Sequence, residues 1–263
     1  ATFTSASYSG KTVDVIATVT VSNADSLSYV LKRKTLVTGN TSSVTATTGT
    51  TVVSGTKVDL TTGQVYISNS SLSTGKISLY VSDVKKIRKI IDTKSSSSTA
   101  TDGMLSSSSY DVTNLFNFDN GQRDSHYDHS SIQLKPGASL PKGNLLVVFD
   151  FYSHTGGDGY FSVESYINES YAEIPTYTTK GGKAYRLTDT LDFRPVRKNE
   201  QTEMVFEYTG NPVVDDTGIL IPTNLSEYIS NYSYYLGRKD KLILTKDKSF
   251  QIVKGTPAAV PSL

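Results

Sequence analysis

The chain has 263 residues, which is enough for one to three domains with a buried core, and its net charge is +1. So balanced a charge argues against a nucleic-acid partner, and the absence of cysteine excludes disulfides, thiol nucleophiles and cysteine-bound zinc. Since no apolar run approaches the ~18 residues that a spanning helix needs, we expect no membrane insertion.

Residues 1–92 predict a small β-sandwich domain of the broad immunoglobulin or fibronectin-III class. Apolar residues alternate along 13–21, which is the pattern of a half-buried strand. Further strand candidates follow at 28–32, 35–40, 51–55, 57–60, 64–67 and 76–82. Turn residues recur roughly every ten positions, a spacing that suits about seven strands. The disulfide and tryptophan of true immunoglobulin domains are absent, so only the broader class is predicted.

Residues 84–91 carry four cations in eight positions. They could form a patch for an anionic ligand. We favour a strand or a short helix that turns Val84, Ile87, Ile90 and Ile91 inward, because an isolated charge run is usually a solvated face.

Residues 93–110 are rich in serine and threonine and predict a flexible linker or loop. We place a domain boundary there. The alternative is that this segment is a long insertion loop, in which case strands of the second half would pair with strands of the first.

Residues 111–263 predict a second, loop-rich antiparallel β domain. Residues 111–116 suit a short helical turn capped by Asp111 or Thr113, and 117–143 are dominated by turn residues. Residues 145–152 form the strongest strand candidate, apolar on both faces except at Asp150, so we expect it to be central. Across the glycine-rich turn at 155–159, residues 160–166 would complete a hairpin. Further candidates are 203–208, 218–221, 230–236, 241–245 and 250–253, the last two joined by a tight turn at Asp247 and Lys248.

The only candidate metal ligands are His126, Asp128 and His129, which lie close together in a predicted loop. Two imidazoles and a carboxylate can bind a divalent cation, but His-x-x-His on a loop is a pattern of low specificity. Hydrogen bonds to the surrounding loop explain these residues equally well. We therefore predict no cofactor and no metal.

Opposite charges gather around the segment 191–195. They comprise Arg186, Asp189, Asp192, Arg194 and Arg197, and an earlier group adds Asp119, Arg123 and Asp124. Paired carboxylates can hydrolyse glycosides, which leaves a polysaccharide depolymerase as an alternative function. Because arginines stand so close, bidentate structural ion pairs are the simpler interpretation. No motif of a known catalytic site is present, so we predict no catalytic residues and no enzymatic activity.

Several islands of the second half resemble a family of large, uncharacterised virion structural proteins of tailed bacteriophages, associated with tails, baseplates or fibres. The islands are FDNGQRD at 118–124, YDH at 127–129, IQLKPG at 132–137, LVVFDF at 146–151, GYFSVESY at 159–166, IPTY at 174–177, LDFRP at 191–195, YYLGRKDKLIL at 234–244 and residues 255–257. The resemblance covers about residues 110–263 and leaves 1–92 outside it.

This resemblance implies a structural component of a phage tail, located in the virion, that assembles through protein–protein contacts. Expected partners are copies of the chain itself, a homotrimer by analogy with fibres, and neighbouring tail proteins. An alternative is a module that binds a host receptor or glycan through the 17 tyrosines and the 117–143 loops. The missing initial methionine leads us to expect a segment of a longer chain.

Overall fold

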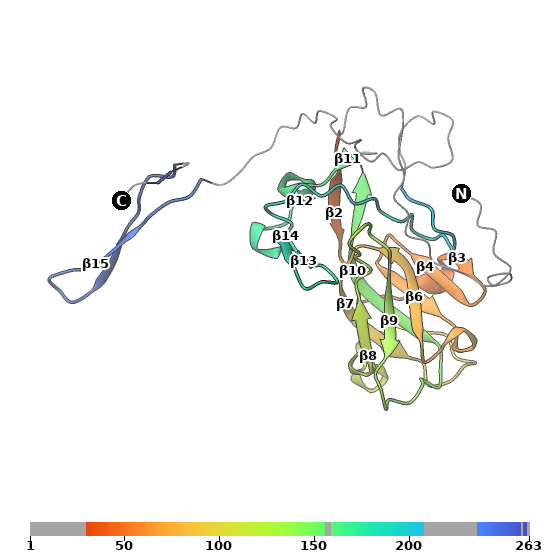
Figure 1. Ribbon diagram of the computed structural model, residues 1–263. Helices are drawn as coiled ribbons and strands as arrows, with labels where there is room; N and C mark the ends of the chain where they lie inside the picture. The colour runs from red at the N-terminus through yellow and green to blue at the C-terminus, as the bar shows by residue number, and fades with distance from the viewer. Residues whose placement is uncertain (1–29, 156–158, 208–235, 259, 262–263) are drawn as a thin grey trace, which may run out of the picture.

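The computed structural model describes residues 30–155, 159–207, 236–258 and 260–261. It is nearly all β, which confirms the predicted fold class. Figure 1 shows the long strand β10 (Leu145–Thr155) running through the body of the molecule. The sheets around this strand position the buried residues described below.

The largest sheet has seven strands. Six follow the order β12-β2-β10-β5-β4-β3, and β7 also pairs with β10. Besides β10, their bounds are β2 (Arg33–Val37), β3 (Thr50–Val53), β4 (Thr56–Asp59), β5 (Gln64–Ile67), β7 (Val84–Asp92) and β12 (Tyr166–Ile167). A three-stranded sheet has the order β6-β9-β8 and consists of β6 (Lys76–Ser82), β8 (Phe116–Asp119) and β9 (His129–Leu134).

Within the described part of the chain, three smaller sheets have two strands each. They are β1 (Val30–Leu31) with β11 (Gly159–Tyr160), β13 (Thr176–Thr178) with β14 (Ala184–Arg186), and β15 (Lys241–Leu244) with β16 (Phe250–Val253). The described helical segments are α1 (Asp102–Ser106) and the 3-10 turns η2 (Ala46–Thr48), η3 (Asn69–Ser71), η4 (Ser108–Tyr110), η5 (Thr113–Leu115), η6 (Val163–Ser165) and η7 (Tyr171–Glu173).

A shared hydrophobic core joins the two larger sheets into a sandwich. The large sheet and β6 each supply alternate residues, as the period of two along a strand requires. The core includes Val58, Val65, Ile67, Ile77, Leu79, Val81, Ile132, Leu134, Leu145, Val147 and Phe149. The prediction of β-sandwich character is therefore confirmed in its general form.

The central position predicted for residues 145–152 is confirmed. β10 pairs antiparallel with β2, β5 and β7, and its first eight residues are all buried. A strand covered on both faces is expected to be apolar, as these eight residues are apart from Asp150. That carboxylate accepts hydrogen bonds from the Gly39 N–H and the Arg88 side chain.

The predicted boundary between a domain at 1–92 and another at 111–263 does not match the strand pairing. β2, β5 and β7 pair with β10, and β6 pairs with β9, so strands from both sides of the boundary share both larger sheets. The alternative of a long insertion loop at 93–110 agrees with this topology. Turn spacing along the chain reports strand lengths but not which strands are neighbours, which is why it suggested two separate domains.

Of the linker and the loop that were predicted for residues 93–110, the structure shows a packed loop. Leu105 in α1 and Ala100 are buried against Ile91 of β7 and Leu146 of β10. The side-chain amide of Asn144 donates to the carbonyls of Ser96 and Ser98. These hydrogen bonds from Asn144, just before β10, fix the backbone of the loop. The composition of the segment alone would suit a flexible linker.

The basic run at 84–91 forms the strand β7, not a helix. Val84, Ile90 and Ile91 are buried and Ile87 packs against the core, as predicted. Lys86 and Arg88 form ion pairs with Asp150.

The hairpin predicted for residues 145–166 does not form. β11 instead pairs in parallel with β1, and β12 pairs in parallel with β2, with the turn η6 between them. The glycine-rich stretch 155–159 lies in the sequence between the end of β10 and the start of β11. Residues 156–158 of that stretch lie outside the described residues.

Other predicted elements are found in part. η5 is the helical turn predicted for 111–116, and the carboxylate of Asp111 accepts from the Thr113 N–H. β15 and β16 form the predicted C-terminal hairpin, with Lys248 at a positive φ of 60° in its turn. The candidate at 203–208 shows only a bridge at Phe206 within its described part. The candidates at 13–21 and 218–221, and all of 230–236 except Leu236, lie outside the described residues.

Candidate functional site

Six polar or ionisable side chains converge in the interior, from segments far apart in the sequence. We call this group the buried cluster, and its members are Lys34, Asp83, Tyr127, His154, Asp192 and Arg194. Ionisable groups of both signs rarely enter a protein core unless they compensate one another. The cluster is therefore the first place to look for chemistry.

Strand register places Lys34 and His154, and a tight connection places Asp83. Lys34 in β2 lies directly opposite His154 in the antiparallel strand β10 and beside Tyr166 in the parallel strand β12. Residues at opposed positions project from the same face of a sheet. Asp83 occupies the connection between β6 and β7, where its φ of 55° is a left-handed conformation that aspartate adopts more readily than most residues.

The ammonium of Lys34 is enclosed by one carboxylate, one hydroxyl and aromatic rings. Its Nζ lies 2.6 Å from Asp83 Oδ2 and 3.1 Å from the Tyr127 hydroxyl. It also lies 4.2 Å and 4.3 Å from the ring centres of Tyr127 and Phe161. The Lys34 side chain is fully buried and that of Asp83 is 3% exposed. Cation–π contacts of this kind offset part of the cost of removing the charge from water.

Asp83 is the acceptor shared by the first half of the cluster. His154 Nε2 lies 2.9 Å from Asp83 Oδ2, and the side-chain amide of Gln122 lies 3.4 Å from Asp83 Oδ1. Burial by itself raises the pKa of the carboxyl, but the charge of Lys34 and the hydrogen bonds from His154 and Lys34 outweigh it. The pKa of Asp83 is consequently held well below its usual value, so an ion pair with Lys34 is the resting state.

The second half of the cluster is centred on Asp192. Arg194 Nε and one terminal nitrogen donate to its two carboxylate oxygens at 3.0 and 2.9 Å, and Tyr127 donates its hydroxyl to the same group. Burial, followed by the charge of Asp192, raises the pKa of Tyr127 well above its usual value, which keeps the phenol protonated. The Tyr127 hydroxyl also lies 3.1 Å from Arg194 and thereby links the two halves.

Four members of the buried cluster form two pairs of opposite charge. Lys34 and Arg194 supply two cations, and Asp83 and Asp192 supply two anions, each within hydrogen-bond distance of its partner. Such an arrangement fixes side-chain positions, since removing one partner would leave a buried charge uncompensated. It also holds an amine and a carboxyl group in contact in an aromatic environment.

The structure does not assemble the candidate metal ligands around a common point. Asp128 Oδ1 accepts from Arg197 and from the His129 N–H, both at 2.8 Å. His129 Nε2 lies 2.8 Å from the Lys198 carbonyl, and His126 Nδ1 lies 2.9 Å from the Ser125 hydroxyl. Within the described ranges, no group of three or more His, Cys, Asp or Glu side chains has a geometry that could hold a metal ion.

The predicted ion pairs are present in part. Asp119 and Arg123 form a bidentate pair with both distances 2.9 Å, and Asp192 pairs with Arg194 as described. Arg197 instead pairs with Asp128. The remaining predicted carboxylates accept hydrogen bonds from tyrosines: Asp189 from Tyr171, and Asp124 from Tyr177.

Sequence reasoning missed Lys34, Asp83 and His154 as members of one site. Lys34 and Asp83 are 49 residues apart, and Asp83 and His154 are 71 apart. No local spacing connects them. The one signal was compositional, since Lys34 lies between predicted strands in a short basic run.

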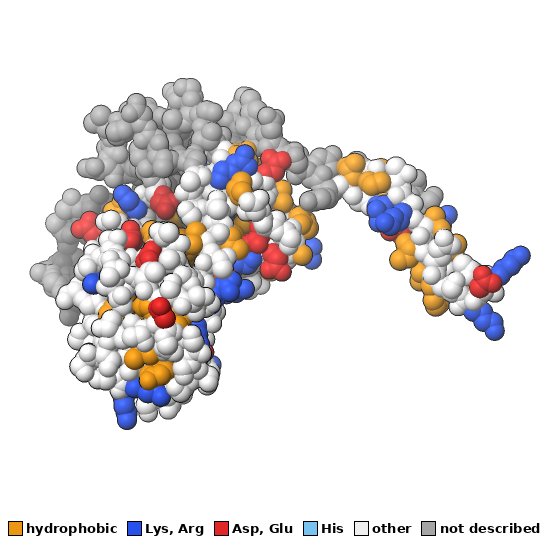
Figure 2. Space-filling view, turned by 180° about the vertical axis from the view of Figure 1, so that it is seen from behind, with side chains coloured by type: hydrophobic (Ala, Val, Ile, Leu, Met, Phe, Trp, Pro, Cys, Tyr) orange, Lys and Arg blue, Asp and Glu red, His pale blue; other side chains and the backbone are white. Residues whose placement is uncertain are grey.

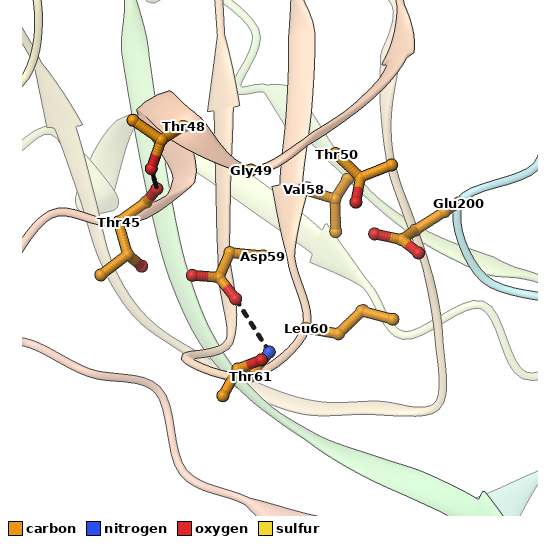
Figure 3. Close-up of a pocket in the computed structure, with 9 residues that line it drawn as sticks. All are labelled: Thr45, Thr48, Gly49, Thr50, Val58, Asp59, Leu60, Thr61 and Glu200. Atoms are coloured by element: carbon orange, nitrogen blue, oxygen red, sulfur yellow. Dashed lines mark hydrogen bonds between the residues drawn. The ribbon is translucent and has the colours of Figure 1, made fainter.

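A polar hollow lies elsewhere, between η2 and the strands β3 and β4 (Figure 3). It is lined by Thr45, Thr48, Gly49, Thr50, Val58, Asp59, Leu60, Thr61 and Glu200. Burial raises the pKa of Asp59, but hydrogen bonds from threonines outweigh it, and the Thr61 N–H donates to its carboxylate at 2.9 Å. With Asp59 bonded to its own turn, we assign no ligand to this hollow.

Comparison with known proteins gives no match: no family model, curated protein or solved structure matches this chain. The likeness to phage virion proteins therefore stays a prediction from sequence. No helix among the described residues is long and apolar enough to cross a bilayer.

Proposed function

We propose that this chain is a non-enzymatic structural component of a bacteriophage tail, in the fibre or baseplate region, that assembles through protein–protein contacts. The family resemblance of residues 110–263 supports the location. An exposed apolar face on the β15–β16 hairpin carries the inference of assembly.

That face follows from the register of the hairpin. Leu242 lies opposite Ile252, and Leu244 lies opposite Phe250, so all four side chains project from one face. Each is between 62% and 73% exposed. Figure 2 shows apolar side chains gathered along this hairpin.

A hairpin of two strands is marginally stable by itself in water, and needs a third strand or a packed layer to cover its apolar face. Contiguous exposed apolar surface of this kind usually marks a protein–protein contact. The proposed partners are other copies of the chain, in a trimer by analogy with fibres, together with neighbouring tail proteins.

The oligomeric state of the purified chain tests the assembly. Sedimentation should show an oligomer for the wild type, and Leu242→Glu with Ile252→Glu should shift it to the monomer. Gln251→Glu is the matched control, because Gln251 lies on the opposite face of β16 and should leave the oligomer intact. A monomeric wild type would remove the observation on which the assembly rests.

Mass analysis of purified virions tests the location. The protein should be found in the particles at a fixed ratio to other tail proteins. Absence of the protein from the particles would contradict its assignment to the virion, whatever the oligomeric state of the isolated chain.

The alternative of a receptor- or glycan-binding module drew on tyrosines and the 117–143 loops. Tyr127, the single tyrosine of those loops, is fully buried in the cluster and so is not available for contacts. Exposed tyrosine surface is found instead at Tyr171 and Tyr185. Binding of labelled protein to host cells, compared with the Tyr185→Ala variant, would test this alternative.

A further inference from the structure

The Lys34–Asp83 pair differs from the other lysine–carboxylate pairs of the described residues. Its two side chains are 0% and 3% exposed, and its atoms are 2.6 Å apart. The pair of Lys85 and Glu169 is 2.8 Å apart but more open, with exposures of 15% and 9%. Lys76 and Asp119 lie at the surface.

The surroundings of this pair are largely aromatic. Beyond Tyr127 and Phe161, the rings of Tyr166 and Tyr152 are centred 5.2 and 5.7 Å from Lys34 Nζ. Transfer of one proton across the short contact converts the ion pair into a neutral amine and a neutral carboxylic acid. The ion pair remains the major form, since the charge of Lys34 keeps the pKa of Asp83 low, and the neutral pair is the minor form in which the amine is nucleophilic.

An amine and a carboxylic acid held in contact are the two reactants of an amide. Holding the amine and the carboxyl group in contact is equivalent to a high effective concentration of one at the other. Exclusion of water disfavours hydrolysis of the amide once it has formed. We propose that Lys34 and Asp83 condense after folding to form an intramolecular isopeptide bond between Lys34 Nζ and Asp83 Cγ.

The step balances without any oxidant or cofactor. The Lys34 ammonium first passes a proton to the Asp83 carboxylate, and the free amine then attacks Cγ, forming the C–N bond. The second proton moves from nitrogen to the departing hydroxyl, and the C–O bond breaks. Both hydrogens of the released water thus come from the ammonium, and the amide keeps one N–H.

His154 is placed to move the second proton. Its Nε2 lies 2.9 Å from Asp83 Oδ2, the same oxygen that contacts Lys34. The imidazole can donate to the departing oxygen and recover a proton from the amine nitrogen, which is general acid–base chemistry. Its position opposite Lys34 in the β2–β10 pairing fixes it beside both reactants.

The bond would join β2 to the connection between β6 and β7, across 49 residues of sequence. The chain has no cysteine and so cannot use a disulfide for such a link. A covalent tie between segments distant in sequence stabilises the folded state mainly by restricting the unfolded chain. This inference concerns the chain's own chemistry and holds whether or not the protein belongs to a virion.

Intact-mass measurement of the full, denatured chain tests the proposal directly. We expect a mass lower by one water than the sequence predicts, and a branched peptide after digestion that contains both Lys34 and Asp83. A wild-type chain of full calculated mass, with the two residues in separate linear peptides, overturns the proposal.

Lys34→Arg separates this bond from a cyclised aspartate, which also loses one water. Arginine keeps the cation but does not form the amide, so the variant should show the full calculated mass. A variant that still loses water would overturn the proposal in favour of cyclisation. Lys85→Arg is the matched control at the more open pair and should keep the loss of water.

His154→Gln tests the proton transfer. This variant should show a smaller cross-linked fraction than the wild type after equal times at equal temperature. An equal fraction would overturn the role given to His154. Because the wild-type mass is measured independently, misfolding of any variant leaves the main test intact.

Discussion

At the scale of single residues, two arginine–aspartate pairs show how burial determines the contribution of an ion pair to stability. Asp192 with Arg194 and Arg238 with Asp240 have the same spacing in sequence and the same bidentate geometry. The first pair is 6–10% exposed and the second is 32–39% exposed. Water screens the second pair, whereas loss of one partner in the first leaves a charge in the core.

We expect Asp192→Asn to destabilise the fold by about 3–5 kcal/mol, because Arg194 would lose its buried counter-charge. The free energy of unfolding in urea measures this effect. Asp240→Asn is the matched control and should change stability far less. Equal effects of the two substitutions would show that burial does not set the strength of these pairs.

The free energy of unfolding should depend on pH through the protonation of His129. Burial first, and then the charge of Arg197, lowers its pKa to about 4, and its buried Nδ1 has no hydrogen-bond partner. The unfolded chain takes up a proton near pH 6.5 that the folded chain does not take up until about pH 4. Stability should therefore be full above pH 6.5 and fall by about 3 kcal/mol as the pH decreases to 4.

Urea unfolding at several pH values between 7 and 4 measures this slope. His129→Gln should flatten it, since glutamine does not titrate. His126, whose pKa burial also lowers, leaves a residual slope of the same sign. The lowered pKa values of carboxyls such as Asp83 and Asp119 add a slope of the same sign below about pH 5, so the contribution of His129 is the difference between the wild type and the variant. An unchanged slope in the variant would contradict the assignment to His129.

At the scale of elements, β10 is the strand on which the others converge, and two glycines allow the close approach. The Phe149 N–H donates to the Gly63 carbonyl at 2.9 Å, and Gly39 donates to Asp150 at 2.8 Å. A Cβ on either glycine would collide with the carbonyl oxygen of Phe149. These turns therefore need glycine for space, and at Gly63 also for its φ of +60°.

Gly63→Ala should destabilise the fold more than Gly137→Ala does. Both positions have positive φ, but nothing lies within 4 Å of a Cβ at Gly137. Strain alone costs about 1–2 kcal/mol at each, and the collision adds roughly 1–3 kcal/mol at Gly63. Thermal unfolding of the two variants makes the comparison, and equal losses would refute a steric role for Gly63.

At the scale of the whole molecule, the two halves of the chain are interlocked. The loop at 93–110 interrupts sheets that both halves build, and its own Leu105 is 1% exposed. Separating the halves would deprive β2, β5 and β7 of β10, and β6 of β9. Each separated half would expose unpaired sheet edges and core residues to water, and would not form a stable fold.

We therefore expect a fragment of residues 1–92 to be unfolded when expressed alone. Circular dichroism should show no cooperative transition, whereas the full chain should unfold cooperatively. Addition of a fragment of residues 93–263 should restore β structure. A cooperative transition in the isolated fragment would instead support an independent N-terminal domain.

Local pattern was enough to locate many elements. Residues 64–67 and 76–82 were predicted with the bounds that β5 and β6 have, because alternation and turn residues act within a few positions. The central position of residues 145–152 followed from an apolar run on both faces. Lys248 in its turn and the pairing of Asp119 with Arg123 are likewise short-range features.

An all-β chain with these strands can be predicted from the sequence, because side-chain periodicity and turn chemistry are local properties. Which strands are neighbours depends on tertiary packing, and both the interlocking of the two halves and the buried cluster follow from that choice. Lys34, Asp83 and His154 meet because β2 pairs with β10 in one register and the β6–β7 connection closes over them. That pairing depends on the free energy of the whole core, which cannot be read from any short stretch of sequence.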